Sequence, residues 1–454
     1  MGWKNVNHLM KAVFILLYRK AMKDLEAWRQ EKTHQALLVT GARQVGKTTL
    51  VREFAHQSYD SLAEINFVET PSAVQTLSAA VNQKDLLLRI SVLTGVEVVP
   101  GKTLLFLDEV QECRDMLTWV KFLAGDGNLD VVLSGSLLGI DAFVNIRSFP
   151  VGFLNVLEMF PLTFEEFCRA NGVGADVWRL AAECVESCAE VPDFLHDALT
   201  RCFREYLLVG GMPDAVQAYV GSGQLPAARR VHEGIVDTYK ADIVKYVEDK
   251  TEARQIKMVY EAIPSQLNAP TKRFKYARLE KNLRFANLET AFDWLTNAGI
   301  AIEATRVGEA RYPLTLSEDR ASFKFFMNDI GLMTSQIMGD VSLEVLDGIE
   351  DINYGSLYEA FVAQELLASG LRPHYYSSKK RGEVDFVVED KRKGKTKLIE
   401  VKSGKSYKRH SALSSLIEAG EAINPVVLYS GNCEQVEDRQ YVPVYAAGLI
   451  GKMF

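Results

Sequence analysis

The stretch GARQVGKTT, residues 41–49, has the residue types and the spacing that hold the phosphates of a nucleotide. Gly41 and Gly46 let backbone N–H groups of the loop converge on phosphate oxygens, and a helix starting at Lys47 adds its positive dipole end. Lys47 is expected to reach the β and γ phosphates, and the Thr48 hydroxyl to ligate Mg²⁺. The residues predicted to contact the nucleotide are Gly41, Ala42, Arg43, Gln44, Val45, Gly46, Lys47, Thr48 and Thr49. ATP and Mg²⁺ are therefore the predicted cofactors.

The alternative is a chance match to this spacing in another kind of loop, and the flanking elements argue against it. An apolar strand (residues 36–39) precedes the loop, and a second apolar run, TLLFLDEVQ, ends in Asp108 and Glu109. At the carboxyl end of a buried parallel strand, Asp108 can hold the metal through water and Glu109 can orient an attacking water. A third run, DVVLSGS, brings Ser134 and Ser136 to the same edge, where a hydroxyl would sense the γ-phosphate. A plain strand-end turn is the alternative for both serines.

A second constellation lies near the carboxyl terminus, in GEVDFVVEDKRKGKTKLIEVKSG. Two apolar runs flank a basic turn at residues 391–394, with glycine in its last position as type I turns favour. The register that opposes apolar residues on both faces pairs Phe386 with Ile399 and places Asp385 opposite Glu400. Like charges so placed repel, and a divalent cation would turn this repulsion into ligation.

Lys402 lies two residues beyond Glu400 on the same face, where it could position or activate a water that attacks phosphate. A helix expected over GSLYEAFVAQELLAS is apolar nearly all round, so the carboxylate of Glu359 needs a partner. The predicted catalytic residues of this region are Glu359, Asp385, Glu400 and Lys402, with Asp385 and Glu400 as metal ligands. The D…ExK layout resembles the PD-(D/E)xK nuclease family, whose pattern places the first acidic residue on such a helix. The alternative is a solvated hairpin in which Lys402 pairs with Glu383.

The chain of 454 residues is too long for one hydrophobic core and suggests about three domains. With 48% hydrophobic and 24% charged residues, its composition is that of a globular protein. The net charge of −7 argues mildly against a nucleic-acid-binding protein, yet two segments are basic. Residues 372–410 carry 13 lysines and arginines against 5 acidic residues, and residues 272–284 carry 6 against 1. Each segment is either a nucleic-acid contact or a solvated face.

The sequence between residues 256 and 320 predicts short helices followed by strands, the order of a winged helix-turn-helix. NLETAFDWLTNAGIA places apolar residues on one helical face, and Gly299 closes the helix near a C-terminal cap. Basic side chains precede this helix, with Phe274 and Tyr276 between them; they are Lys272, Arg273, Lys275, Arg278, Lys281 and Arg284. Such a patch suits contacts to DNA phosphates. The alternative is a module that packs against the nucleotide-binding part.

The motifs GARQVGKTT, LFLDEVQ, LSGSLLG and MFPLTFEEF together resemble a large prokaryotic family of AAA-type ATPases fused to a C-terminal region of unknown function. The resemblance continues through YLLVGGMPDAV, DIVKY and FKFFMNDIGL and covers nearly the whole chain. It implies ATP binding, a helical lid, a winged-helix segment and a restriction-endonuclease-like end. Arg147, the only arginine close after the third strand, does not match an arginine finger, so no residue is assigned to hydrolysis in trans.

The predicted fold is an α/β multidomain protein, with a P-loop NTPase parallel sheet, a helical lid, a winged helix and a restriction-endonuclease-like α/β C-terminal domain. The predicted divisions are 1–33 (an N-terminal helix starting near Met10), 34–165 (AAA-type ATPase core), 166–255 (helical lid), 256–320 (winged helix) and 321–454 (nuclease-like domain).

The predicted function is an Mg²⁺-dependent ATPase whose nucleotide state moves a DNA-binding, nuclease-like C-terminal region. The alternative is a non-catalytic switch in which ATP loading exposes that region to a protein partner. DNA is the candidate partner of the basic segments, and a homo-oligomer is the candidate assembly. Six cysteines in so long a chain do not form a dense disulfide framework, and AVFILLY at residues 12–18 is too short to span a bilayer. A cytoplasmic protein with no membrane partner is expected.

Overall fold

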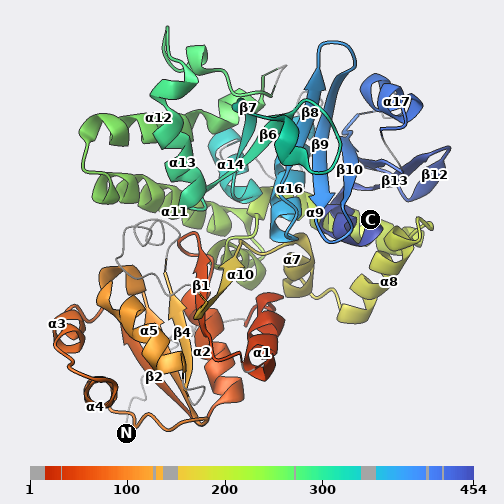
Figure 1. The fold of residues 1–454 in the computed structure, drawn as a ribbon. Coiled ribbons are helices and arrows are strands. Elements are labelled where there is room, and N and C mark those ends of the chain that lie inside the picture. Colours follow the sequence, from red (N-terminus) through yellow and green to blue (C-terminus); the bar gives the residue numbers. More distant parts are fainter. Residues whose placement is uncertain are drawn as a thin grey trace, which may run out of the picture.

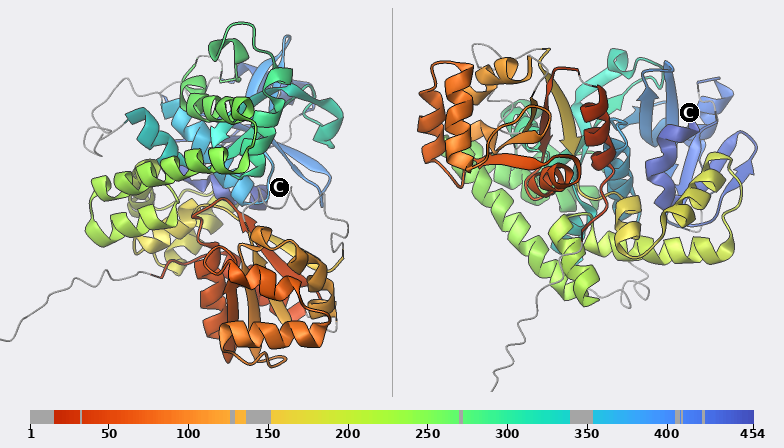
Figure 2. Two further views of the ribbon diagram at one scale, coloured as in Figure 1. Left: turned by 90° about the vertical axis from the view of Figure 1, so that its left-hand side faces the viewer. Right: turned by 90° about the horizontal axis from the view of Figure 1, so that it is seen from below.

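The computed structural model describes two α/β parts joined by a helical segment. It describes residues 16–31, 33–125, 129–135, 152–269, 272–338, 354–404, 408, 410–421 and 424–454. Figure 1 shows the first sheet, red to orange, in one half of the molecule and the second, teal to blue, in the other. In the view from below in Figure 2, the yellow and green helices run from one half to the other.

The first sheet has five parallel strands in the order β2-β3-β4-β1-β5. The strands are β1 (Ala36–Gly41), β2 (Ser61–Asn66), β3 (Thr103–Asp108), β4 (Asp130–Ser134) and β5 (Leu154–Met159). The side chains of alternate β1 residues pack in different hydrophobic cores: Leu37 and Val39 belong to one cluster and Leu38 to the other. The sheet is therefore buried on both faces, as the continuous apolar runs predict.

Helices cover both faces of this sheet (Figure 1). They are α1 (Ala21–Glu31), α2 (Lys47–Ser58), α3 (Ser72–Ser78), α4 (Gln83–Thr94) and α5 (Asp115–Gly125), with a short 3-10 turn η1 (Val110–Glu112) after β3. The expected start of the first helix near Met10 lies outside the described residues. Residues 16–20 are not helical, so the described part of this helix begins at Ala21.

The helical segment predicted as a lid is confirmed as helical. It contains α7 (Phe164–Ala170), α8 (Ala175–Glu186), α9 (Asp193–Val209), α10 (Pro213–Ser222), α11 (Leu225–Tyr246) and α12 (Lys250–Leu267). Gly210 and Gly211 separate α9 from α10, and Pro213 occupies the first turn of α10, where its missing N–H has no helical partner to lose. Thr163 and Glu166 form a capping box at the start of α7.

The second sheet has eight strands in the order β12-β13-β11-β10-β9-β8-β6-β7. The strands are β6 (Ala301–Val307), β7 (Glu318–Met327), β8 (His374–Ser378), β9 (Gly382–Asp390), β10 (Lys395–Val401), β11 (Val426–Tyr429), β12 (Glu434–Val436) and β13 (Arg439–Pro443). The accompanying helices are α13 (Glu289–Asn297), α14 (Ile330–Met338), α16 (Tyr354–Ala368) and α17 (Ser411–Glu418), with 3-10 turns η2 (Tyr276–Arg278), η3 (Phe285–Asn287), η4 (Leu314–Ser317) and η5 (Val444–Met453). Helix α16 packs against this sheet and against η5.

The segment predicted as a winged helix does not form a separate unit. Its strands β6 and β7 pair with each other, but β6 also pairs in parallel with β8, so both belong to the second sheet. The predicted boundary at 320/321 therefore falls inside β7, and those at 165/166 and 255/256 fall inside α7 and α12. The local sequence pattern predicted strands here. The strand that pairs with β6 to place both in the second sheet, β8, lies far along the chain. None of the helices in the described ranges is both long and apolar enough to cross a bilayer.

Candidate active site

The phosphate loop joins the end of β1 to the start of α2 and is shaped by its glycines. Gly41 has φ 139°, and a Cβ there would lie 2.2 Å from the Met159 carbonyl oxygen on β5. Gly46 has φ 91° and caps α2. Because other residues rarely adopt these conformations, the loop requires glycine at both positions. The backbone therefore has the form that the sequence predicts for a phosphate cradle.

Lys47 is buried at the first position of α2. Its ammonium group donates to the carbonyl oxygens of Gly41, at 3.1 Å, and Ala42, at 2.9 Å. Burial lowers the pKa of Lys47 to about 8, although Glu109 and Asp108 act in the opposite direction. At neutral pH the side chain is thus still mostly cationic, with an ammonium group that phosphate oxygens can attract away from the loop carbonyls.

Three polar side chains donate hydrogen bonds to the buried carboxylate of Asp108, which lies at the end of β3. The Thr48 hydroxyl donates to Oδ2 at 2.9 Å, and Asn66 Nδ2 donates to the same oxygen at 2.9 Å. The Ser134 hydroxyl donates to the other oxygen, Oδ1. The predicted Mg²⁺ ligands Thr48 and Asp108 are therefore in contact, and Ser134 supports the aspartate. Ser136 lies outside the described residues.

Asn66 is a site residue that the sequence reading missed. It ends β2 and stands directly opposite Asp108 in the parallel pairing of β2 with β3. A polar residue at the carboxyl end of a strand is a signal that could have found it, because parallel strands end at one edge of the sheet.

Glu109 follows Asp108 in a left-handed backbone conformation, with φ 56°. This turn directs its side chain to the same cavity that Lys47 and Thr48 line. Its carboxylate accepts a hydrogen bond from Gln111 Nε2. Glu109 thus reaches the cavity from β3 while Lys47 and Thr48 reach it from α2, an arrangement that suits a group orienting an attacking water.

The cavity has a volume of about 850 Å³ and extends well beyond the phosphate loop. The segment before α1 contributes apolar lining through Leu16, Leu17 and Tyr18, and α1 contributes Met22. Helix α10 contributes Pro213, and Thr49 lines the floor. A space this large, lined by both apolar and polar side chains, suits a nucleotide base and its phosphates. The sequence reading did not include the N-terminal segment in this site.

Helix α11 contacts the phosphate loop directly. Arg43 forms an ion pair of 2.9 Å with Asp242 and donates to the Tyr246 hydroxyl at 2.6 Å. The Tyr239 hydroxyl donates to the Arg43 carbonyl oxygen at 3.2 Å. Asp242 and Tyr246 are the first and last residues of the motif DIVKY, so α11 holds the phosphate loop through Arg43.

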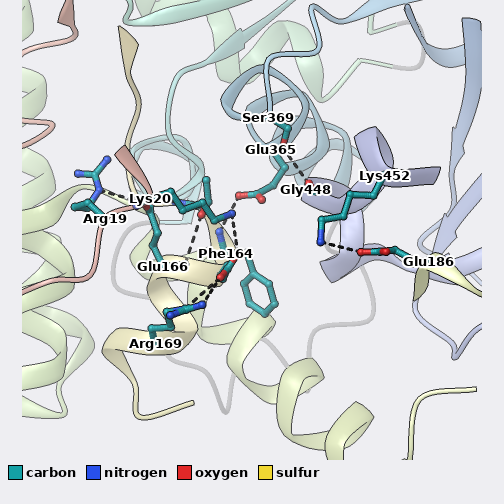
Figure 3. Close-up of polar contacts among 12 residues, drawn as sticks. Arg19, Lys20, Phe164, Glu166, Arg169, Glu186, Glu365, Ser369, Gly448 and Lys452 are labelled. Carbon is teal, nitrogen blue, oxygen red and sulfur yellow. Dashed lines mark hydrogen bonds and ion pairs between the residues drawn. The ribbon is translucent and has the colours of Figure 1, made fainter. Parts of the chain in front are cut away.

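Arg19 connects the N-terminal segment to the phosphate loop and to α7, and Figure 3 shows it beside Glu166 of α7. Its guanidinium group donates to the carbonyl oxygens of Val45, at 2.7 Å, and Phe160, at 2.6 Å. It also donates to Glu166 at 3.3 Å, and the backbone N–H of Lys20 donates to the same carboxylate at 2.6 Å. One half-buried arginine therefore links the phosphate loop to the capping box of α7.

The contact continues from α7 into the C-terminal part. The backbone N–H of Phe164, at the start of α7, donates to Glu365 on α16 at 2.8 Å (Figure 3). Burial raises the pKa of Glu365 to about 7. One turn further on, directly after the end of α16, Ser369 donates to the Gly448 carbonyl oxygen at 3.1 Å. Helix α16 is thus held between the ATP-side helices and η5.

The predicted C-terminal hairpin has the predicted register. Strands β9 and β10 oppose Phe386 to Ile399 across a turn at residues 391–394. The carboxylate of Asp385 accepts the backbone N–H of Val401 at 2.8 Å. Burial raises the pKa of Glu400 to about 7, and the negative charge of Asp385 adds to the effect. Asp385 and Glu400 therefore lie close enough to repel, as expected.

The partners of these carboxylates differ from the expectation. Lys402 forms an ion pair with Glu400 at 2.6 Å, not with Glu383. The buried ammonium of Lys324, on β7, lies 2.9 Å from Glu383, 3.2 Å from Glu359 and 3.7 Å from Asp385. Burial tends to lower the pKa of Lys324, but these carboxylates raise it overall. The sequence reading missed Lys324; its signal was a single lysine inside the apolar strand FKFFM.

The C-terminal residues do not fit the predicted divalent cation. Glu359 is bound by Lys324 and by Lys272, and Asp385 by Lys324 and a backbone N–H. Within the described ranges, no group of three or more His, Cys, Asp or Glu side chains is placed to hold a metal ion. Ammonium groups of the chain itself lie beside the predicted ligand pair, Lys324 near Asp385 and Lys402 near Glu400.

The predicted basic patch is only partly available to a ligand. Lys272 points inward to Glu359, and Phe274 is buried among aromatic rings that include Phe292 and Phe323. The Tyr276 hydroxyl donates to the Ala321 carbonyl oxygen at 2.8 Å. Phe274 is therefore part of the core, and the half-buried Tyr276 packs against it. The exposed members of the patch are Arg273, Lys275, Arg278, Lys281 and Arg284.

Comparison with known proteins matches three ranges of the chain to domain families. Residues 33–168 match a family described as an AAA domain. Residues 200–341 and 354–447 match two domains of unknown function, DUF8612 and DUF4143. Residues 33–168 are thus an AAA-type P-loop ATPase domain, and the chain is an ATPase.

Full-length relatives are distant. An uncharacterized protein of Methanocaldococcus jannaschii is 23% identical over 407 residues, which cover 84% of this chain and 81% of that protein. Among solved structures, a Walker-type ATPase of Pyrococcus abyssi is 15% identical, covers 71% of this chain and 96% of its own, and has a TM-score of 0.41. The ORC2 protein of Aeropyrum pernix is 13% identical, with coverages of 73% and 96% and a TM-score of 0.37.

Proposed function

We propose that this chain binds ATP with Mg²⁺ at the phosphate loop, hydrolyses it, and passes the nucleotide state to its C-terminal part. The observation that carries the proposal is the convergence of Lys47, Thr48, Asp108 and Glu109 at the carboxyl edge of the first sheet. Three of them line one cavity, and Asp108 is hydrogen-bonded to Thr48 at 2.9 Å.

Each residue then has a distinct role. Lys47 exchanges its two carbonyl partners for phosphate oxygens and neutralises their charge. Thr48 and Asp108 would hold Mg²⁺, which when bound supplies positive charge beside the phosphates. Asn66 and Ser134 fix the orientation of the Asp108 carboxylate. Glu109 accepts a hydrogen bond from the attacking water and orients it toward the terminal phosphate.

The path to the C-terminal part starts at Arg19 and Arg43. The Arg19 side chain contacts the phosphate loop and α7, and Arg43, a residue of that loop, contacts α11 through its side chain. A shift of the loop on nucleotide binding changes these contacts, and the link from Phe164 to Glu365 carries the change to α16. Hydrogen exchange measured with ATP and with ADP tests the path, because wild type should differ at α16 and Arg19→Ala should not.

DNA is the proposed partner of the exposed basic residues Arg278, Lys281 and Arg284. Support comes from their exposure and clustering, since contacts to phosphates need accessible cations. Gel shifts at rising salt concentration test this partner. A steep loss of binding with salt, and weaker binding when the three residues are replaced by glutamine, are expected. DNA binding that changes neither with salt concentration nor with these replacements would contradict this proposed contact.

A second candidate function is a switch with very slow turnover that recruits a protein partner. One observation favours it. Among the described residues that line the cavity, the arginines are Arg19 and Arg43, and both guanidinium groups already contact protein atoms. A neighbouring molecule would then have to supply an arginine for fast hydrolysis, which also makes a homo-oligomer a proposed assembly.

The deciding experiment measures ATP binding and turnover on the same variants. Lys47→Ala should lose binding, whereas Glu109→Gln should bind ATP and stop hydrolysing it. Turnover that is unchanged in both variants would contradict the ATPase site. Tight binding with negligible turnover in wild type at every protein concentration would favour the switch.

A further inference from the structure

We propose that ammonium groups of this chain replace a divalent cation among the C-terminal carboxylates, with Lys324 at the metal position, so that the region is a metal-independent ionic core and not a nuclease centre. The group is called the C-terminal cluster; its members are Lys272, Lys324, Glu359, Glu383, Asp385, Glu400 and Lys402. The proposal is independent of the ATPase site.

Lys324 lies between two elements that the cluster joins. Its ammonium group contacts Glu359 on α16 at 3.2 Å and Glu383 on β9 at 2.9 Å. The side chain is only 1% exposed, and the ring centroids of Tyr375 and Phe386 lie 5.2 Å and 6.0 Å from the ammonium nitrogen. A charge enclosed by carboxylates and aromatic faces has no solvated position nearby, so a metal ion could not displace it by a simple side-chain rotation.

The remaining carboxylates are also engaged by the chain itself. Lys272 contacts the second oxygen of Glu359, and Lys402 contacts Glu400 Oε1 at 2.6 Å. The Asp385 oxygen that faces away from Lys324 accepts the Val401 N–H. Among the buried carboxylate oxygens in the described part of the cluster, the one with no hydrogen-bond partner is Glu400 Oε2. Mg²⁺ requires several oxygen ligands, which this single buried oxygen does not provide.

The net charge of the C-terminal cluster also argues against a bound divalent cation. The cluster contains four carboxylates and three ammonium groups, so its formal charge is −1 when all are ionised. Adding a divalent ion would make it positive and would place that ion within reach of three lysines. The cluster instead holds α16 on the sheet, and α16 carries the Glu365 contact to α7. We therefore infer a structural role in fixing this helix.

The test uses the full chain with the Lys47→Ala substitution and without nucleotide, which removes metal binding through ATP phosphates. Mn²⁺ binding is followed by electron paramagnetic resonance. Without further substitution, no Mn²⁺ site that depends on Asp385 is expected up to millimolar metal. Adding Lys324→Ala should create a site whose affinity for Mn²⁺ is at least about tenfold higher than that of the protein without this substitution. Adding Asp385→Asn as well should remove that site.

Lys397→Ala is the matched control, because Lys397 is also a buried lysine of the same sheet but donates to the Asn424 carbonyl oxygen at 3.1 Å. It should gain no site. If Lys324→Ala does not fold, the double variant Lys324→Ala, Glu359→Gln lowers the uncompensated charge and is titrated in its place. For wild type, the melting temperature without nucleotide should be the same in EDTA and in Mn²⁺.

Three results would overturn the proposal. The first is an Mn²⁺ site, or nicking of plasmid DNA, that wild type shows and Asp385→Asn lacks. The second is a folded Lys324 variant that gains no Mn²⁺ binding. The third is a wild-type melting temperature that rises with Mn²⁺ and does not do so in Asp385→Asn. ATP turnover plays no part in these readouts, so failure here and failure of the ATPase proposal are distinct.

Discussion

Thr48 donates a hydrogen bond of 2.9 Å to Asp108, which lies 60 residues further along the chain. This contact joins the first turn of α2 to the end of β3 and brings together the two side chains that would hold Mg²⁺. The strand order places β4 between β1 and β3, so Ser134 reaches Asp108 from the strand between them. The site therefore depends on sheet topology as much as on the loop motif.

Asp108→Asn should lower ATP hydrolysis by about 10²- to 10³-fold, the usual loss for one strong transition-state contact. The amide has no negative charge with which to hold Mg²⁺ next to Thr48. Steady-state turnover at saturating ATP and Mg²⁺ measures this effect. Asp60→Asn, at an exposed carboxylate outside the site, is the control and should retain wild-type turnover. Equal turnover in the two variants would exclude Asp108 from metal binding.

Asn66→Asp should reduce Mg²⁺ affinity or turnover by about 10- to 100-fold, as is typical when a partner of a metal ligand is lost. The substitution keeps the oxygen that accepts the Val68 and Glu69 N–H groups but removes the donor to Asp108. A Mg²⁺ titration of turnover separates a shift in metal dependence from a loss of folded protein. An unchanged Mg²⁺ dependence would show that Asn66 does not position Asp108.

Gly41→Ala should destabilise the ATPase domain and abolish ATP binding. The new Cβ would meet the Met159 carbonyl oxygen at 2.2 Å, and the φ of 139° disfavours any side chain. Thermal unfolding should show a drop of several degrees, whereas Gly95→Ala, which meets nothing within 4 Å, should cost only about 1 kcal/mol. Similar losses in both variants would mean that close approach at Gly41 is unimportant.

Glu365→Gln should make stability less dependent on pH. The folded-state pKa of Glu365, raised to about 7 by burial, lies above its usual value of 4.5, so folding takes up a proton between these pH values. Its contribution to stability is present at low pH and falls as pH rises through 7. The fall is at most about 3 kcal/mol. Glutamine keeps the acceptor for the Phe164 N–H without the charge.

Urea unfolding of wild type and Glu365→Gln at pH 5 and pH 8 measures this difference. The variant should gain stability relative to wild type at pH 8 and not at pH 5. Asp329 and Glu400, whose pKa values burial also raises, act in the same direction in both proteins and cancel in the comparison. Parallel pH profiles would contradict a neutral, buried Glu365.

Short-range chemistry made parts of this molecule predictable. The phosphate loop, the apolar strand before Asp108 and the hairpin register around Asp385 all follow from residues close together in sequence. A position that requires positive φ selects glycine, and a strand buried on both faces selects a continuous run of apolar residues, so both leave a local pattern in the sequence. The turn at residues 391–394 fixes which residues of β9 and β10 can face each other.

The sequence by itself determined a nucleotide loop, its acidic strand end and a hairpin with two facing carboxylates. Only the tertiary structure decided what neutralises those carboxylates, because Lys324 comes from β7 and Glu359 from α16. It also decided that Arg19 holds the phosphate loop and that β6 pairs with β8. Electrostatic energy depends on distance in space, and elements far apart in the chain meet only when their apolar faces pack together. A charged residue's partner therefore cannot be read from its neighbours in sequence.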